Sequence, residues 1–262
     1  MKLFKYLSLI PLLSLASIHS EASENMIDKM ETAEKAYNNR LKQTRVAFMS
    51  IETMFPDENV RALAIAAADG DVDKIDEIVK GGVDVNSKGT SNAIPLYWAM
   101  HNIKGFEKLL QLGADPNFKF GLGSNIMYWA VAKNDVEQLK LAIKYGGNPS
   151  VISGSMKRPL ILDAFSKDEA IMDTLLTAGA DVNSKTQFGM TMLMMAAARG
   201  QYNIVYKLLL HGADYNYVNK KGVGLLKYIN KTRTRELKGK FLDDFIKVEK
   251  WLIEKGYIDS EE

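Results

Sequence analysis

The side chains that could carry chemistry are few and widely spaced. The chain has 262 residues, three histidines and no cysteine, which excludes disulfides, thiol nucleophiles and cysteine-ligated metal centres. His101 and His211 have no second histidine at ligand spacing and predict no metal site. Residues 121–123 lack the lysine of a phosphate-binding loop, and residues 153–155 lack the pattern of a serine nucleophile. We therefore expect no catalytic residue, no metal and no cofactor.

The composition excludes two further classes of protein. Lys and Arg number 34 against 32 Asp and Glu, a formal net charge of +2, which argues against a dedicated nucleic-acid binder. Hydrophobic residues make up 47% and charged residues 25%, a balance typical of folded globular chains rather than disordered ones. The expected class is a folded protein that acts through its surface.

The first 22 residues have the pattern of a secretory signal peptide. Lys2 and Lys5 precede residues 6–20, which carry no charged side chain, and Ser20 and Ala22 supply small residues two apart. The apolar run is shorter than the roughly 20 residues that span a bilayer, although an uncleaved anchor is the alternative. A short, lysine-flanked leader on a cysteine-free chain favours bacterial export, so we expect a periplasmic protein.

Two motifs recur with one spacing through the rest of the chain. The first is Gly-x-Asp/Asn-x-Asn/Ser, whose third residue stands at positions 84, 115, 148, 181 and 214. The second is an apolar anchor followed by small or apolar residues at helical spacing. The anchors are Leu63, Leu96, Met127, Leu160, Leu193 and Leu226, and the small residues include Ala66, Ala67, Ala99, Ala130, Ala164, Ala196 and Ala197. Most intervals are 33 residues, so one structural unit is repeated.

This pattern resembles the ankyrin repeat family, most closely at residues 189–214. The resemblance implies an all-α ankyrin-repeat solenoid of five to six helix–turn–helix units with hairpin-like loops. Gly212 stands where a helix ends in the left-handed region, and Asp214 and Asn216 are placed to bond the following turn. The apolar stripe of the second helix is formed by Ile204, Val205, Leu208 and Leu209.

The repeat divides the chain into four expected segments. They are the signal peptide at 1–22, N-terminal capping helices at 23–56, ankyrin repeats 1–5 at 57–217, and a degenerate sixth repeat with a C-terminal cap at 218–262. The sixth unit holds eleven extra residues, supplied by the largely basic stretch at 230–240. This stretch predicts a longer first helix or an inserted loop, either as solvated cap or as a contact for an acidic partner.

Some units depart from the pattern. The second unit is two residues shorter, which predicts a shortened helix or joint. Asp163 stands where the other units have alanine, and a carboxylate there is costly unless it is paired. Asp163 is either a satisfied structural residue or a buried switch or catalytic acid.

The resemblance also implies a recognition face for another protein, formed by the loop tips and the outer ends of the first helices. The corresponding positions are Asp69, Thr90, Ser91, His101, Asn102, Phe118, Phe120, Leu122, Lys133, Ser155, Lys157, Phe165, Ser166, Gln187, Phe188, Met190, Arg199, Lys220 and Lys221. The aromatic and apolar members are expected to meet solvent and form an interface centre, or to fold back onto neighbouring loops. Trp98 and Trp129 share one repeat position and predict either core packing or an aromatic shelf.

The function that follows from this resemblance is protein binding without catalysis. Exported bacterial ankyrin proteins of this size look like immunity proteins, which bind and occlude a secreted effector such as a lipase or peptidoglycan hydrolase. The expected partner is such an effector, with no nucleic acid and no membrane insertion after cleavage, and the chain alone is expected to be a monomer. The alternatives are an envelope housekeeping factor, such as a periplasmic holdase or a protector of an oxidative-stress enzyme, and an enzyme using Asp163.

Overall fold

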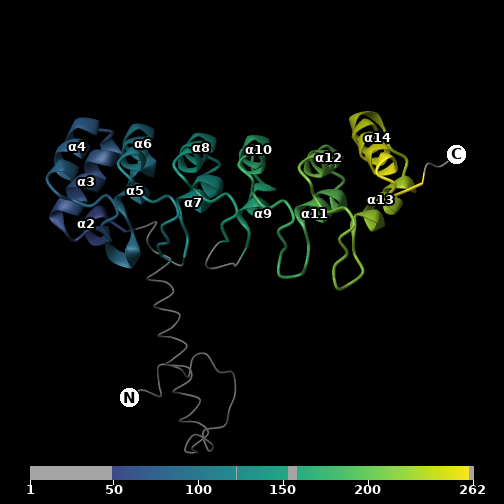
Figure 1. The fold of residues 1–262 in the computed structure, drawn as a ribbon, viewed down its shortest axis with the longest axis horizontal. Helices are drawn as coiled ribbons and strands as arrows, with labels where there is room; N and C mark the ends of the chain where they lie inside the picture. Colours follow the sequence, from purple (N-terminus) through teal and green to yellow (C-terminus); the bar gives the residue numbers. More distant parts are fainter. Residues whose placement is uncertain (1–48, 122, 153–157, 260–262) are drawn as a thin grey trace, which may run out of the picture. The chain divides into compact units, whose positions relative to one another are not determined.

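Short helices alternate in pairs along the chain in the computed structural model, which describes residues 49–121, 123–152 and 158–259 (Figure 1). A short helix, α2 (Ile51–Met54), precedes the pairs. The first helices are α3 (Glu58–Asp69), α5 (Pro95–Trp98), α7 (Ile126–Lys133), α9 (Leu160–Ala164), α11 (Met192–Ala198) and α13 (Leu225–Arg233). The second helices are α4 (Val72–Lys80), α6 (Ile103–Gln111), α8 (Val136–Lys144), α10 (Glu169–Thr177), α12 (Tyr202–Leu210) and α14 (Gly239–Glu254). The predicted signal peptide and most of the predicted N-terminal capping segment lie outside the described residues.

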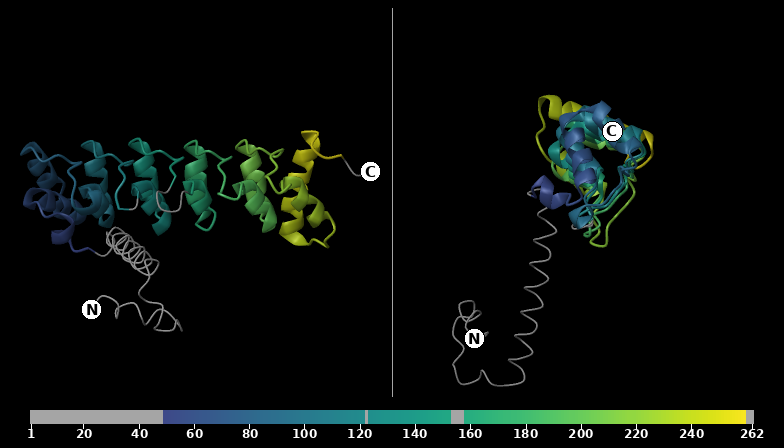
Figure 2. Two further views of the ribbon diagram at one scale, coloured as in Figure 1. Left: turned by 90° about the horizontal axis from the view of Figure 1, so that it is seen from below. Right: turned by 90° about the vertical axis from the view of Figure 1, so that its left-hand side faces the viewer.

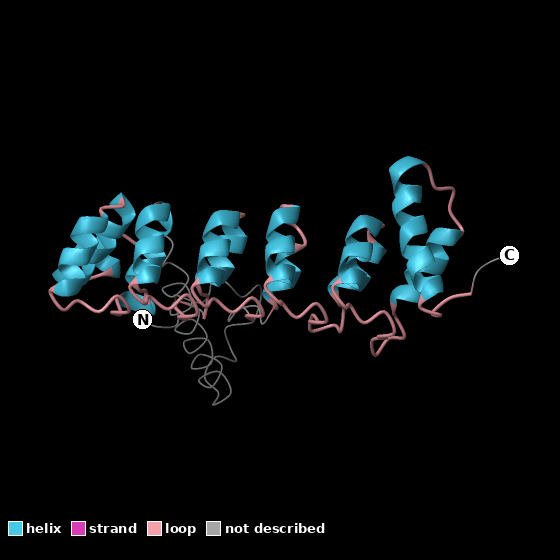
Figure 3. Cartoon of the chain, turned by 45° about the horizontal axis from the view of Figure 1, so that its top comes forward, coloured by secondary structure: helices cyan, strands magenta, loops and turns pink. Residues whose placement is uncertain are grey.

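The two helices of a pair lie in different layers. In Figure 1 the second helices form the upper row, the first helices lie below them, and the connecting loops extend further down. Within the described residues the loops form isolated β-bridges rather than strands, such as Lys185 with Thr191 and Val218 with Gly224 (Figure 3). The predicted hairpin-like loops are therefore confirmed. No helix in this part of the chain is both long and apolar enough to cross a bilayer.

Local side chains set where the helices begin and end. The carboxylate of Asp135 accepts a hydrogen bond from the Gln138 N–H (2.9 Å) and caps α8. Asn134, in place of the glycine of other units, ends α7 with a φ of 59°, a left-handed conformation that asparagine tolerates. Gly212 has a φ of 82° just after α12, as the sequence predicted.

The predicted anchors form the core of the stack. Five of the six, from Leu63 to Leu193, are at most 1% exposed. The seven alanines predicted from the repeat are buried as well, so neighbouring first helices approach closely. Leu226 is the exception, since it is only half-buried while the adjacent Leu225 is buried. The last unit has no further repeat to cover the anchor position.

The second unit is shortened at its first helix and joint. α5 has four residues and continues directly into a 3₁₀ turn, η6 (Ala99–His101), and Asn102 then caps α6. α6 crosses α3 so closely that a Cβ on Gly105 would lie 1.8 Å from the carbonyl oxygen of Ala67. A glycine is therefore required at this crossing.

The sixth unit uses its extra residues mainly in the second helix. α13 has nine residues, only two more than α11, whereas α14 has sixteen. α14 packs on α12 through Phe245, whose ring centroid lies 4.9 Å from that of the buried Tyr202. The prediction of a longer first helix or an inserted loop therefore missed the main change, a lengthened second helix that covers the end of the stack.

Amide side chains connect successive units at the turns. The Asn117 side chain donates to the Gly146 carbonyl (2.8 Å) and accepts from the Asn148 N–H (2.7 Å). Asn86 and Asn183 make the equivalent pair of bonds to the turns that follow them. Because each amide satisfies one donor and one acceptor of the next unit, the turns are held in register.

Candidate protein-binding surface

The hairpin loops and first helices of units two to six form one continuous surface, which we call the hairpin face. It comprises residues 87–102, 118–121, 123–134, 151–152, 158–167, 184–200 and 217–235. The end-on view shows the loops of successive units projecting in the same direction from the helices (Figure 2). A linear stack therefore presents equivalent loop positions side by side, as a preformed surface.

The structure places the predicted recognition residues in four groups. Those exposed are Asp69, His101, Lys133, Ser166, Gln187, Phe188, Arg199, Lys220 and Lys221. Those half-buried are Thr90, Ser91, Asn102, Phe118 and Met190. Phe120 and Phe165 are buried, and Leu122, Ser155 and Lys157 lie outside the described residues.

Phe120 and Phe165 follow the second of the two expectations, since they fold back onto the stack instead of meeting solvent. Phe120 is 2% exposed because its ring turns inward against Tyr97, with centroids 4.7 Å apart. Phe165 is 7% exposed because the Arg199 guanidinium of the next unit lies over its ring, 4.5 Å from the centroid. Both rings therefore pack between units of the solenoid. At Phe165 the Arg199 guanidinium covers the ring, so the surface there presents a charge in place of an aromatic ring.

Phe188 is the most prominent apolar group of the hairpin face. It is 69% exposed at the tip of a hairpin that the Thr186 hydroxyl closes by accepting from the Phe188 and Met190 N–H groups (3.3 and 3.1 Å). Ile152 and Val218 are 54% and 51% exposed and share one repeat position in the neighbouring hairpins. Sequence reasoning missed these two, although counting eight residues back from each anchor would have found them.

The hairpin of the second unit is tied to its neighbours. The Thr90 hydroxyl donates to the Thr53 carbonyl (2.6 Å), and the Ser91 carbonyl accepts from the Gly121 N–H (2.9 Å). Ser91 and Asn92 both adopt left-handed backbone conformations. Thr90 and Ser91 therefore hold the loop in place, and any contact with a partner comes in addition to this structural role.

The two tryptophans lie at the boundary between core and surface. Trp129 is half-buried, with its ring edge-on to Tyr97 at 5.6 Å, and Trp98 is half-buried beside His101. Three partly exposed side chains, Ile65, Met195 and Tyr228, occupy the same position two residues after their anchors. At this position five of the six units thus present a large side chain that is partly exposed, whereas Leu162 in α9 is buried.

Asp163 is held as a structural residue. Its side chain is 16% exposed, and its Oδ1 lies 3.0 Å from the Arg158 Nε. Burial raises the pKa of Asp163, while the charges of Arg158 and Lys167 act in the opposite direction. The ion pair favours a structural residue over a catalytic acid, and Oδ2 of Asp163 is buried with no hydrogen-bond partner among the described residues.

The histidines assemble no site in the described structure. His101 is exposed at the end of η6, and its Nδ1 donates to the Trp98 carbonyl at 2.6 Å. His211 follows α12 at the C-cap, as predicted. Among the described residues, no three His, Asp or Glu side chains gather in a way that could hold a metal ion.

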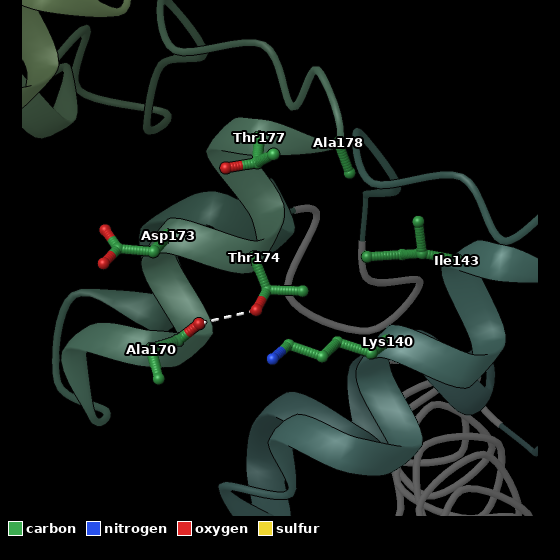
Figure 4. Close-up of a pocket in the computed structure, with 7 residues that line it drawn as sticks. All are labelled: Lys140, Ile143, Ala170, Asp173, Thr174, Thr177 and Ala178. Carbon is green, nitrogen blue, oxygen red and sulfur yellow. Dashed lines mark hydrogen bonds between the residues drawn. The ribbon is translucent and has the colours of Figure 1, made fainter.

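A shallow groove of about 610 Å³ lies on the opposite side of the stack, between α8 and α10 (Figure 4). Lys140 and Ile143 of α8 face Ala170 and Thr174 of α10 across it. The Thr174 hydroxyl donates to the Ala170 carbonyl (2.7 Å), and the nearby carboxylate of Asp173 is engaged by Lys207. Thr174 and Asp173 therefore already have partners, and the Lys140 amine forms no acid–base pair with a group that lines the groove.

Comparison with known sequences identifies the repeat. Residues 126–219 match the family model of ankyrin repeats in three copies. An ankyrin repeat protein of Rickettsia felis is 32% identical over 139 residues, which is 50% of this chain and 45% of that protein. The palmitoyltransferase AKR1 of Lachancea kluyveri is 24% identical over 165 residues, 60% of this chain. The chain spans only 22% of that enzyme's length.

Solved structures share the fold. An ankyrin repeat domain from Acinetobacter baumannii AYE has a TM-score of 0.59 and 23% identity, over 74% of this chain and 97% of that one. A chain of the Bdellovibrio bacteriovorus predatory endopeptidase Bd0816 in complex with immunity protein Bd3460 has a TM-score of 0.54 and 24% identity, over 71% and 97%. Together with the helix pairs and hairpins above, these matches show that the chain carries ankyrin repeats, which are protein-interaction modules, and that its described part has the all-α ankyrin fold.

Proposed function

We propose that this chain is an exported immunity protein that binds and occludes a secreted antibacterial effector, such as a lipase or a peptidoglycan hydrolase, in the periplasm. The hairpin face grips the effector and covers its cleft. The chain itself catalyses nothing in this proposal, because its role is steric.

The observation that carries the proposal is the row of exposed apolar side chains on a braced surface. Phe188, Ile152 and Val218 lie in three hairpins of successive units. Asparagine side chains in the turns join neighbouring units by hydrogen bonds. Exposed apolar groups of this kind are typical of interaction sites, and aromatic side chains dominate their binding energy. A preformed surface also loses little conformational entropy on association.

Two further observations support the immunity role. The fold is shared with a chain of a structure that contains an immunity protein and its endopeptidase. Residues 1–22, which lie outside the described structure, carry the pattern of an export signal. The similarity to the palmitoyltransferase covers ankyrin repeats only, so it supports no transfer of that enzyme's activity.

Copurification from the periplasm tests the proposal. The full chain is captured with a small tag, and the bound proteins are identified by mass spectrometry. We expect one stoichiometric secreted hydrolase whose activity falls when the complex forms. Phe188→Ala combined with Ile152→Ala should weaken the complex at least about tenfold, because both remove buried interface area.

Leu210→Ala provides the matched control. Leu210 is 61% exposed on α12, so the substitution removes a comparable apolar group from the opposite layer. The control should bind like the wild-type chain. Many weak partners in place of one hydrolase would instead indicate a holdase, and equal losses in both variants would contradict the hairpin face as the binding surface.

A further inference from the structure

Charge is segregated between the two layers of the solenoid, which the net charge of +2 conceals. The described residues of the hairpin face include thirteen Lys and Arg residues and a single acidic residue, Asp163. Six of its exposed cations are Lys119, Lys133, Lys185, Arg199, Lys220 and Lys221. In units two to six the other acidic residues stand on the second helices, just before them or in the turns that follow them, whereas the first helix of unit one carries Glu58 and Asp69.

Three cations of the second helices form ion pairs with carboxylates of the preceding second helix. Lys108 of α6 pairs with Asp76 of α4 at 2.7 Å, and Lys144 of α8 pairs with Glu107 of α6 at 3.0 Å. Lys207 of α12 pairs with both Glu169 and Asp173 of α10. This layer therefore uses its charges to join consecutive units.

Three cations of the hairpin face lie over aromatic rings, whereas Arg158 and Arg233 pair with carboxylates. The Lys88 amine lies 5.3 Å from the centroid of Phe118, and the Lys185 amine lies 3.8 Å from that of Tyr217. Both pairs occupy the same two repeat positions, and Arg199 lies over Phe165 in a similar way. A ring orients a cation without cancelling its charge, so the face keeps its positive field. Among the described residues, none of these three cations forms an ion pair with a carboxylate.

We propose that the hairpin face binds an acidic protein surface, whose carboxylates meet the exposed cations around an apolar centre formed by Phe188, Ile152 and Val218. This inference rests on the proposed function and defines the chemistry of its partner. Complementary charge speeds encounter and excludes partners of like charge. The exposed aliphatic groups Ile152 and Val218 fit a protein better than a nucleic acid, since bases are bound by stacking on planar groups.

Charge reversal in the full chain tests the inference. The hairpin set is Lys185→Glu, Arg199→Glu and Lys220→Glu, and the control set is Lys80→Glu, Lys104→Glu and Lys250→Glu on the exposed sides of α4, α6 and α14. Both sets change the net charge equally. The probes are immobilised peptides of alternating Asp and Leu, the same peptides with Lys in place of Asp, and single-stranded DNA.

We expect the wild-type chain to bind the Asp–Leu peptides more tightly than either other probe, with weaker binding at high salt. The hairpin set should lose at least about tenfold in affinity, and the control set less than about twofold. Tighter binding to DNA, equal losses in the two sets, or no binding to the Asp–Leu peptides would overturn the inference.

The copurified partner separates this inference from the proposed function. A partner that is lost with Phe188→Ala but kept by the hairpin set overturns the acidic-surface inference and leaves the proposed function standing. If the chain binds the Asp–Leu peptides but no hydrolase copurifies from the periplasm, the acidic-surface inference stands and the proposed function is overturned.

Discussion

The side-chain amide of Asn117 bridges to the Asn148 backbone of the following unit, with its oxygen 2.7 Å from the Asn148 nitrogen. Its own nitrogen reaches the Gly146 carbonyl at 2.8 Å. One side chain thus satisfies two backbone groups of the neighbouring turn. The regular spacing of the hairpin face depends on such bridges, because each unit contacts only its neighbours in a solenoid.

Replacing this bridge should weaken the stack. Asn117→Ala leaves the Gly146 carbonyl and the Asn148 N–H without their partner, so we expect a loss of about 1–3 kcal/mol in the free energy of unfolding. Urea unfolding followed by circular dichroism measures it. Asn216→Ala is the matched control, because this residue has the same repeat position but its side-chain amide makes no hydrogen bond within the described structure. Similar losses in the two variants would contradict the bridging role.

Gly105→Ala should be strongly destabilising. The new Cβ would lie 1.8 Å from the Ala67 carbonyl oxygen, so α6 must move away from α3. We expect a cost of about 3 kcal/mol, at the upper end of overpacking effects. Gly81→Ala, where a Cβ has its nearest neighbour at 3.2 Å, should cost much less. Thermal melts of both variants measure the difference, and a wild-type melting temperature for Gly105→Ala would show that the crossing is looser than described.

The pH dependence of stability should report on Asp163. Burial raises its pKa above the ordinary value of 3.8, so over the interval between the two values the folded chain binds more protons than the unfolded chain. The stabilising contribution of the protonated carboxyl is therefore complete below the unfolded pKa and lost as the pH rises through the folded pKa. Asp163→Asn removes this dependence.

The unfolding free energy of Asp163→Asn should therefore increase relative to that of the wild-type chain as the pH rises from the ordinary value of 3.8 through the folded pKa. Urea titrations at several pH values measure this difference. Parallel stability profiles for the two chains would mean that the carboxyl group titrates normally in the folded state.

Tyr202 links the last ankyrin pair to the cap. Its buried hydroxyl lies 2.6 Å from the Thr232 hydroxyl of α13. Tyr202→Phe leaves the buried Thr232 hydroxyl unpaired, so we expect a loss of about 1–2 kcal/mol. Hydrogen exchange should then show faster opening of α13 and α14 than of α7 and α8. Uniform acceleration across the stack would contradict a local role for this bond.

Repeat spacing predicted the solenoid because it reflects a local and periodic constraint. The anchors, the buried alanines and the left-handed Gly212 all follow from requirements that each unit meets on its own. The orientation of Phe120 and Phe165 depends instead on residues of adjacent units, Tyr97 and Arg199, whose distances the sequence does not contain. Such contacts between units explain why exposure on the candidate surface was only partly predictable.

The ends of the stack were harder to predict for a related reason. A terminal unit must cover a core that no further repeat will cover, and several arrangements of helix and loop achieve this. The chain uses the sixteen-residue α14, with Phe245 packed on Tyr202. Nothing in the spacing of the preceding repeats specifies that solution.

Hydrogen–deuterium exchange of the full chain, alone and with its copurified partner, tests the central claim most directly. We predict slower exchange in the hairpins at residues 185–191 and 218–224 and in the C-terminal ends of the first helices, with unchanged exchange on the outer sides of α8, α10 and α12. Protection confined to those second helices, with unaltered hairpins, would contradict the hairpin face as the surface that binds the partner.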